Sequence, residues 1–300
     1  MNARDAPRHP RLTPARGDLA AASLRGVVEA ERYVEGETFT VTAEVADLKR
    51  APRPDAPLDT QLLFGEAVTV YEDENGWAWV QAERDLYVGY VATHALVRGR
   101  RRATHRVTTK RTFVYPAADM KQPILGAIPL DGRVLVEEIA GGFARTADHA
   151  FVFAAHLAPL DDVVPDYVEA ALRLLGSPYL WGGRSPLGID CSGLVQLAAS
   201  LAGYAVPRDT DMQAAVGEGV PVDRSLQGLL RGDLVFWTGH VGIMLDAETL
   251  LHANAHHMLV AREPLVLARD RIAATGGNEI VTARRFTGVL GGISRANTRC

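Results

Sequence analysis

The sequence predicts an α+β domain preceded by two small all-β barrels, and three observations lead to this fold class. Residues 38–98 contain short β-branched and aromatic runs separated by turn sequences, which is typical of a small barrel. A weaker version of the same pattern recurs over 99–160. From about residue 161, two helical patterns are followed by strand-like runs, the order typical of an α+β domain.

The overall composition limits the classes of function. The 300 residues are 47% hydrophobic, which is enough for one to three domain cores. A formal net charge of −4 gives no support for a nucleic acid as the main partner. Of the two cysteines, Cys300 is the last residue, so a disulfide framework is not expected.

The N-terminal segment, 1–37, mixes proline, arginine and small residues and is expected to form a partly irregular arm. Its first ten residues contain no apolar stretch of a signal peptide, and no run of about 18 apolar residues follows in the chain. We therefore expect a cytoplasmic protein without a membrane partner. Export by a non-classical route would leave no such signal.

The first barrel is predicted over residues 38–98. Turn sequences such as Glu74-Asn75-Gly76 separate its strand-like runs. The predicted strands are 38–43, 61–64, 67–71, 77–81 and 87–91.

The second barrel, 99–160, is inferred from a weak internal repeat. Segment 63–96 can be laid beside 129–159, and both segments end in a short His-containing stretch, at His94 and at His156. Two tandem barrels are the simplest account of this repeat.

A basic run, Arg-Gly-Arg-Arg-Arg at 98–102, lies between the two predicted barrels. It is compatible with a solvated linker or with a phosphate-binding patch. We favour the linker, because a phosphate patch normally needs more than one short cluster.

The third region, 161–286, begins with two predicted helices. Apolar residues between Val164 and Leu175 recur on one helical face, and Gly176 marks the end of that helix. A second helix is predicted to start at or near Cys191 and to end near Gly203. Strands are predicted over 232–237, 240–245, 250–254, 259–262 and 280–285, followed by a tail over 287–300.

Cys191 is the first candidate for chemistry, because it lies where a glycine-rich loop turns into the second helix. A thiol in the first turn of a helix is favoured as the thiolate, since the helix N-terminus carries partial positive charge and unpaired N–H groups. The alternative is an inert core residue, which is the usual state of a free cysteine. The position of Cys191 alone does not decide between the two.

A cysteine nucleophile needs a base, and the base must be oriented. His240 and His252 lie in neighbouring predicted strands, twelve residues apart across a hairpin. If those strands pair, His240 can face the thiol while His252 fixes its tautomer and ring plane. Any single histidine more often has a structural role, so the argument rests on the three residues together.

A metal site is the alternative use of the histidines at positions 252, 256 and 257. A zinc enzyme needs three well-placed ligands and an open position. His256 and His257 fall in a predicted turn, and no second cysteine is near them. We expect no metal ion and no other cofactor.

The motifs around these residues resemble the NlpC-type cell-wall cysteine peptidases, over about residues 163–286. The matching blocks, in family order, are Tyr179–Gly183, Asp190–Gly193, Pro207–Thr210 with Gln213, Arg231–Trp237, His240–Ile243 and the strand of His252. The resemblance implies a papain-like fold with Cys191, His240 and His252 as the catalytic triad. The barrels resemble bacterial SH3-like domains, the first more closely than the second.

Further site residues carry over by resemblance alone. Tyr179 would help to hold the carbonyl oxygen, together with the backbone N–H of Cys191. Trp181 would form a wall of the pocket. Asp190 and Ser192, on either side of the nucleophile, would bind the D-glutamyl portion of a substrate.

Asp209 and Thr210 match an acidic-hydroxyl pair of the family. In relatives specialised for recycled peptides, the acidic residue holds the free L-alanyl ammonium of the substrate. In the same subgroup the first barrel adds an acidic residue and a tyrosine to that pocket, although the tyrosines here could equally be ordinary barrel aromatics. The candidates are Asp59 or Glu66, and Tyr87 or Tyr90.

The resemblance implies a cysteine endopeptidase that hydrolyses the γ-D-glutamyl bond to a diamino acid in short murein peptides. A peptide with a free N-terminal L-Ala, as formed in peptidoglycan recycling, is the expected partner. The alternatives are an amidase or acyltransferase on the same fold, and a non-catalytic cell-wall-binding protein. The preferred diamino acid, the need for a free N-terminus and the oligomeric state stay open.

Overall fold

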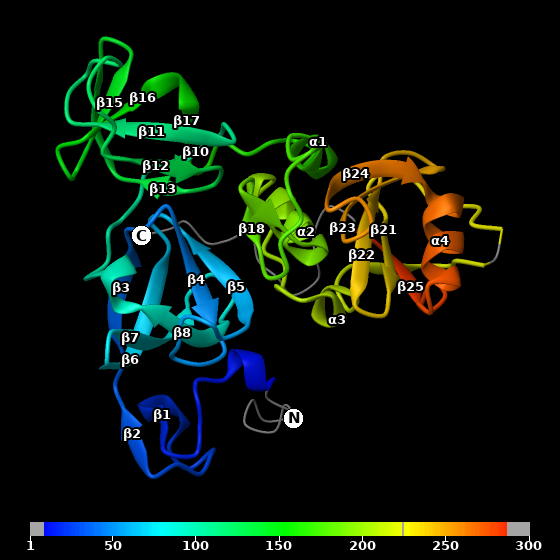
Figure 1. Cartoon of the computed structure of the whole chain (residues 1–300), viewed down its shortest axis with the longest axis horizontal. Coiled ribbons are helices and arrows are strands. Elements are labelled where there is room, and N and C mark those ends of the chain that lie inside the picture. The colour runs from blue at the N-terminus through cyan, green and yellow to red at the C-terminus, as the bar shows by residue number, and fades with distance from the viewer. Residues whose placement is uncertain (1–8, 224, 287–300) are drawn as a thin grey trace. The chain divides into compact units, whose positions relative to one another are not determined.

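The structure, a computed structural model, describes residues 9–223 and 225–286. The chain divides into two compact units, 1–159 and 160–300, whose elements are traced in Figure 1. The predicted tail, 287–300 with Cys300, lies outside the described residues, as do the first eight residues of the N-terminal arm.

The described part of the N-terminal arm is more regular than its composition suggests. It contains the 3-10 helices η1 (Pro10–Leu12) and η2 (Ala22–Leu24) and the parallel strands β1 (Leu19–Ala21) and β2 (Arg32–Val34). The Arg16 guanidinium lies 4.7 Å from the ring centre of Trp79 and donates a 2.8 Å hydrogen bond to the Tyr90 hydroxyl. These contacts attach the arm to the strands that follow.

The region of the first predicted barrel is a seven-stranded antiparallel sheet in the order β5-β4-β8-β7-β6-β3-β9. Its strands are β3 (Glu37–Val41), β4 (Val45–Lys49), β5 (Leu58–Leu63), β6 (Ala67–Glu74), β7 (Trp77–Ala82), β8 (Val88–Ala92) and β9 (Leu96–Arg98). Their buried side chains, among them Leu48, Val80 and Val91, form one apolar core. The sequence-based prediction missed β4, because Ala46, Asp47 and Lys49 are poor strand formers.

Residues 105–159 form two small antiparallel sheets, ordered β13-β10-β17 and β12-β11-β16-β15-β14. The strands are β10 (His105–Val107), β11 (Arg111–Tyr115), β12 (Gly126–Pro129), β13 (Arg133–Val134), β14 (Val136–Ala140), β15 (Phe143–Thr146), β16 (Phe151–Phe153) and β17 (Leu157–Pro159). The two halves of the predicted repeat share a pattern of strand, 3-10 helix and strand. In the first half η3 (Thr93–Ala95) lies between β8 and β9, and in the second η4 (Ala154–His156) lies between β16 and β17.

The basic run at 98–102 is neutralised locally. Three of its arginines pair with acidic side chains: Arg98 with Glu37, Arg100 with Glu83, and Arg101 with Asp148. Arg100, Arg101 and Arg102 also line a cavity together with Arg111 and Arg133, so the linker stays a prediction.

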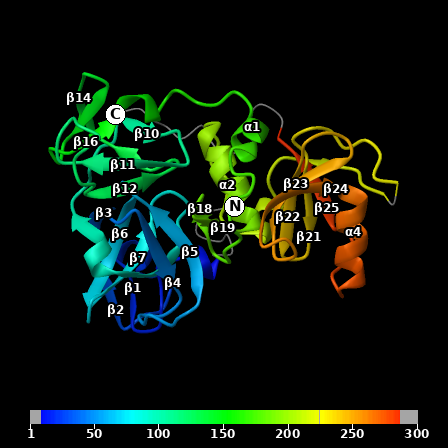
Figure 2. The ribbon, with the colours of Figure 1, turned by 45° about the horizontal axis from the view of Figure 1, so that its top comes forward.

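The second unit combines short helices with a six-stranded antiparallel sheet, ordered β20-β25-β21-β22-β23-β24. The helices are α1 (Tyr167–Leu172), α2 (Cys191–Leu201), α3 (Thr210–Gln213) and α4 (Leu265–Ala274). The strands are β20 (Glu218–Val220), β21 (Leu234–Trp237), β22 (His240–Met244), β23 (Thr249–Asn254), β24 (Leu259–Pro264) and β25 (Thr282–Arg285), and β18 (Arg184–Ser185) and β19 (Gly188–Ile189) form a separate ribbon. Helix α2 packs against α1 and against β22 and β23 (Figure 2).

The two predicted helices of this unit are confirmed, with glycines just beyond their ends. Asp166 caps α1 by accepting a 2.8 Å hydrogen bond from the Val168 N–H. Gly176 and Gly203, which follow α1 and α2, have φ angles of 79° and 81°, the left-handed region that favours glycine. Within 9–223 and 225–286, no helix has the length and apolar character needed to cross a bilayer.

Helix α4 is absent from the sequence-based prediction. It follows β24 without a glycine or a capping side chain, and its first residues do not show an apolar stripe. Leu265 and Ala268 are buried, whereas Val266 and Leu267 are exposed. The amphipathic signal on which a helix prediction depends is therefore weak here.

Candidate active site

Cys191 is the first residue of α2, and the residue before it holds the loop in place. Asp190 is the N-cap of the helix, and its carboxylate accepts hydrogen bonds from the Gly193 N–H at 2.7 Å and the Gly182 N–H at 2.9 Å. A Cβ atom at Gly193 would lie 2.3 Å from the backbone oxygen of Gly183, so only glycine permits this approach of loop and helix. The glycine-rich loop and its cap thus fix the backbone that carries the thiol.

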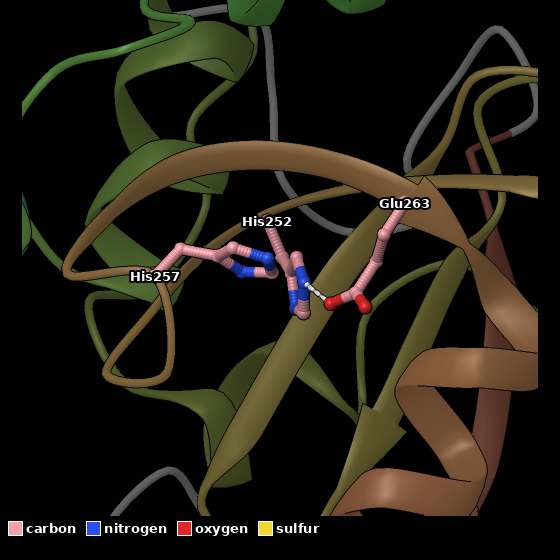
Figure 3. A group of neighbouring side chains, drawn as sticks. All are labelled: His252, His257 and Glu263. Carbon is pink, nitrogen blue, oxygen red and sulfur yellow. Dashed lines mark hydrogen bonds and ion pairs between the residues drawn. The ribbon is translucent and has the colours of Figure 1, made fainter.

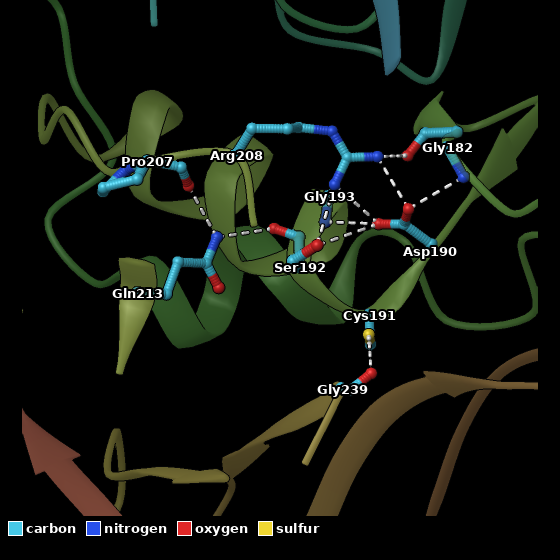
Figure 4. A network of polar contacts seen from close by, with 10 residues as sticks. Gly182, Asp190, Cys191, Ser192, Gly193, Pro207, Arg208, Gln213 and Gly239 are labelled. Carbon is cyan, nitrogen blue, oxygen red and sulfur yellow. Dashed lines mark hydrogen bonds and ion pairs between the residues drawn. The ribbon is translucent and has the colours of Figure 1, made fainter. Parts of the chain in front are cut away.

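A buried arginine holds the same segment from the other side (Figure 4). Arg208 is 1% exposed and donates to the Asp190 carboxylate at 2.7 and 3.0 Å and to the Ser192 hydroxyl at 2.8 Å. Gln213 adds a 3.0 Å hydrogen bond to the backbone oxygen of Ser192. We call Arg208, Asp190, Ser192 and Gln213 the Arg208 cluster.

The structure places the two predicted histidines side by side. His240 begins β22 and His252 lies in β23, which pair as antiparallel neighbours. His240 Nε2 lies 2.8 Å from His252 Nδ1. The contact uses the His240 nitrogen farther from its own backbone and leaves Nδ1 for another partner.

The chain of contacts continues beyond the predicted triad (Figure 3). His252 Nε2 lies 2.7 Å from Glu263 Oε1 in β24, and Arg271 of α4 donates a hydrogen bond to the same oxygen. We call His240, His252, Glu263 and Arg271 the histidine relay. Sequence reasoning missed Glu263 and Arg271. The strand register contains the signal for Glu263: His252 pairs with Ala261, and a residue two positions further along β24 lies on the same face.

The thiol lies next to the start of the relay. Cys191 Sγ is 4.0 Å from the backbone oxygen of Gly239, the residue directly before His240. Cys191 is 6% exposed and His252 is fully buried. The thiol therefore lies beside the turn that leads into β22, on the side where α2 packs on β22 and β23.

Burial makes the resting thiol and imidazole neutral. Desolvation, assisted by the Asp190 charge, raises the pKa of the Cys191 thiol to about 12. Desolvation, together with His252 and Arg271, lowers the pKa of His240 to about 3. The expected stabilised thiolate is therefore wrong for the resting protein, since burial outweighs the helix N-terminus.

Tyr179 and Trp181 lie on the loop before the nucleophile. Burial, with smaller effects from Cys191 and Asp190, raises the pKa of Tyr179 to about 12, so its hydroxyl stays protonated and able to donate. Trp181 is 68% exposed.

Asp209 and Thr210 lie at the start of α3, directly after Arg208. Asp209 occupies the N-cap position, but its side chain makes no capping hydrogen bond to the helix. Both residues are partly exposed. Arg208, which directly precedes Asp209, contacts the loop of Cys191 through Asp190 and Ser192.

The four barrel candidates have different surroundings within the first unit. Glu66 is 3% exposed and accepts hydrogen bonds from the Leu63 N–H and from Arg84. Tyr87 is 4% exposed and belongs to the apolar core of the sheet, as an ordinary barrel aromatic would. Asp59 pairs with Arg50, and the Tyr90 hydroxyl accepts from Arg16. Asp59 and Tyr90 are the more accessible members of the set.

Three groups of this region have the spacing of metal ligands. One ligand atom each of His252, His257 and Glu263 lies within 4.8 Å of the others. The protein already uses these groups: Glu263 joins His252 to Arg271, and His257 Nδ1 lies 3.0 Å from Asn254 Oδ1. An incoming cation would meet the Arg271 guanidinium at Glu263, so the described contacts fit a protein relay better than a metal centre.

Known proteins resemble both regions of the chain. Residues 176–265 match the NlpC/P60 family, and residues 48–96 match the bacterial dipeptidyl-peptidase Sh3 domain. The chain is 29% identical over 225 residues to a gamma-D-glutamyl-L-lysine dipeptidyl-peptidase of Bacillus subtilis (strain 168), which covers 66% of this chain and 73% of that protein. It is 42% identical over 88 residues to dipeptidyl-peptidase 6 of Lysinibacillus sphaericus, covering 29% of this chain and 31% of that protein.

The solved structure of an NlpC/P60 family protein from Bacillus cereus ATCC 10987 shows the same fold. Its TM-score is 0.71 at 20% sequence identity, and the match covers 83% of this chain and 99% of that one. The fold, the two sequence matches and the cysteine beside paired histidines all agree. The matches therefore assign an NlpC/P60 domain to residues 176–265 and an SH3 domain to residues 48–96, and together with the named relatives they support a cysteine peptidase.

Proposed function

We propose that the chain hydrolyses the γ-D-glutamyl bond to a diamino acid in short murein peptides. The observation that carries this proposal is the hydrogen-bonded pair of His240 and His252 beside the buried Cys191, at the N-terminus of α2. The bond is chosen by analogy with the Bacillus subtilis relative, a gamma-D-glutamyl-L-lysine dipeptidyl-peptidase by name.

In the proposed reaction Cys191 Sγ attacks the γ-carbonyl carbon while His240 Nδ1 takes the thiol proton. The transfer accompanies the attack, because the resting thiol and imidazole are both neutral. The Cys191 backbone N–H and the Tyr179 hydroxyl donate to the oxyanion. His240 then gives the proton to the departing amino group, and water hydrolyses the thioester.

Substrate selection is proposed to lie around α3 and the nucleophile loop. Ser192 and Asp190 would contact the D-glutamyl portion, but the Asp190 carboxylate is already held by Arg208 and two backbone N–H groups. Its contribution is therefore to place the loop more than to supply a charge. Asp209 and Thr210 would hold a free L-alanyl ammonium, which favours recycled peptides over N-blocked ones.

The first unit is proposed to contain two SH3-like barrels, 38–98 and 99–160. The shared strand, 3-10 helix and strand pattern that ends each half supports the second copy. Of the four barrel candidates, Asp59 and Tyr90 are the more accessible ones, because Glu66 and Tyr87 are buried inside the first unit. The predicted cytoplasmic location stays a prediction.

Product analysis tests the proposed function. Purified full-length protein is incubated with L-Ala-γ-D-Glu-L-Lys and with L-Ala-γ-D-Glu-meso-diaminopimelate, each with a free and with an acetylated N-terminus. Mass spectrometry should detect L-Ala-D-Glu and the free diamino acid, with faster turnover of the free-amine peptides. Cleavage at the L-Ala–D-Glu bond instead, or acyl transfer without hydrolysis, would contradict the proposal.

A further inference from the structure

Glu263 occupies the end of a continuous line of hydrogen bonds that leads to His240. The line runs from Glu263 Oε1 to His252 Nε2 over 2.7 Å, and from His252 Nδ1 to His240 Nε2 over 2.8 Å. The Glu263 side chain is 12% exposed and is paired with Arg271. Water therefore has little access to compete for these contacts.

The charge state of Glu263 determines which nitrogen of each histidine ring in this line carries the proton. Burial acts to raise the pKa of Glu263, but its contacts with His252 and Arg271 outweigh burial and lower it, so the group is a carboxylate at neutral pH. Burial lowers the pKa of His252 to about 4, although Glu263 acts to raise it, so its ring is neutral. A carboxylate can only accept a hydrogen bond, and a neutral imidazole has a single N–H.

The tautomers follow step by step. His252 must donate from Nε2 to Glu263, which leaves its Nδ1 as an acceptor. His240 must then donate from Nε2 to His252, which leaves the lone pair on His240 Nδ1. That atom is the one the proposed reaction needs as the base for the thiol.

We propose that Glu263 is a positioning residue that selects the Nε2–H tautomer of His240 through His252. The inference rests on the proposed function, since it specifies how that base is prepared. Glu263 touches neither the thiol nor a substrate. Its role is to keep the proton of His240 on Nε2, so that Nδ1 can accept the thiol proton.

The reaction uses the same line when charge develops. As His240 accepts the thiol proton, its ring becomes cationic, and the Glu263 carboxylate attracts that charge through His252. The charged or titratable groups that face the two rings are Glu263 of β24, Arg271 of α4 and His257 of the turn after β23, together with Cys191 of α2 on the thiol side. Arg271 opposes the cationic state of the rings while it holds Glu263 in place.

Two substitutions of Glu263 distinguish the effect of its hydrogen-bond acceptor from the effect of its negative charge. Glu263→Gln retains an oxygen that can accept from His252, whereas Glu263→Leu removes the acceptor. We expect Glu263→Leu to lower kcat by about 10²-fold at an unchanged KM, since general-base catalysis is worth about 10²–10⁴-fold. Glu263→Gln should lose less than about tenfold. Glu248→Gln, at an exposed turn before β23, is the matched control and should retain full activity.

The tautomers are measured without any substrate, by ¹H–¹⁵N correlation spectra of the histidine rings in the full chain at neutral pH. The native protein and Glu263→Gln should show His240 with its proton on Nε2, and Glu263→Leu should show a mixture of both tautomers. Alkylation of Cys191 by iodoacetamide should slow in parallel with the loss of the Nε2–H form. Circular dichroism spectra that match the native protein show that Glu263→Leu folds.

An unchanged His240 tautomer with activity within twofold of native in Glu263→Leu would overturn the inference. If Glu263→Leu fails to fold, the spectra of the native protein and of Glu263→Gln decide, and a His240 proton on Nδ1 in either of them would overturn the inference. Failure of the proposed function looks different: the tautomers would be as stated, but murein peptides would not be cleaved.

Discussion

The Arg208 cluster and the histidine relay both contain an arginine–carboxylate pair, yet they act on the site in different ways. In the Arg208 cluster, both oxygens of Asp190 are occupied by Arg208 and by backbone N–H groups of the nucleophile loop. In the relay, the Glu263 carboxylate lies against His252, and His252 lies against His240. One carboxylate fixes backbone positions, and the other fixes where protons lie.

This difference shows that buried ion pairs beside one active site can have different roles. Arg208 is 1% exposed, so the cluster is costly to break and rigid. Each histidine of the relay has two neutral tautomers, so small electrostatic changes alter which nitrogen can accept a proton. The predictions below separate the two roles, beginning with the largest effect.

His252→Ala should lower kcat most, by about 10³-fold, within the range of general acid–base catalysis. The substitution removes the acceptor for His240 Nε2, and the ring of His240 loses its fixed tautomer and orientation. Steady-state kinetics on L-Ala-γ-D-Glu-L-Lys measure the effect. Activity within tenfold of the native enzyme would show that another group orients His240.

Arg208→Met should chiefly destabilise the second unit, by about 3–5 kcal/mol in the free energy of unfolding, because it leaves Asp190 buried without its cation. Urea unfolding measures the loss. The matched variant is Arg285→Met, which removes the partner of Asp233, another buried carboxylate, away from the nucleophile loop. Only Arg208→Met should also lower kcat, and equal kinetics for the two variants would contradict a loop-holding role.

Arg271→Met should make activity more sensitive to acid. The Arg271 charge lowers the pKa of both histidines, so its removal raises them, and His240 must be neutral to accept the thiol proton. Activity present above the His240 pKa is therefore lost at a higher pH than in the native enzyme. A profile of kcat/KM from below the His240 pKa of about 3 up to pH 8 should show the acid limb moving towards neutrality. Movement in the opposite direction would exclude this electrostatic role.

Asp209→Ala should have the smallest effect and a selective one. Loss of the proposed ammonium partner should reduce kcat/KM for free-amine peptides by about tenfold, the loss of about 1.4 kcal/mol of binding energy. N-acetylated peptides should be affected less than twofold. Competition between the two peptides, followed by mass spectrometry, measures the ratio directly, and equal losses on both would remove Asp209 from the pocket.

Much of the fold could be predicted because local signals agree with it. Helices α1 and α2 of the second unit are marked by apolar periodicity and by Gly176 and Gly203, and the strands of His240 and His252 are runs of mainly apolar residues. What was missed lacked such signals. Strand β4 contains poor strand formers, and α4 has exposed apolar residues where a buried stripe is expected.

The candidate site divides in the same way. Cys191, His240 and His252 are visible in the sequence because a thiol and two imidazoles in motif order suggest one chemistry. Glu263 and Arg271 are ordinary charged residues until the register of β23 with β24 and the packing of α4 bring them to His252. The pKa of Cys191 was predicted in the wrong direction because the extent of burial depends on tertiary packing.

Intact-protein mass spectrometry of the acyl-enzyme tests the central claim most directly. Full-length protein is mixed with L-Ala-γ-D-Glu-L-Lys, quenched in acid within the first turnovers, and digested to locate the adduct. The account predicts an L-alanyl-γ-D-glutamyl thioester on Cys191, and neither adduct nor hydrolysis in Cys191→Ala. Hydrolysis that persists in Cys191→Ala, or an adduct on another residue, would contradict it.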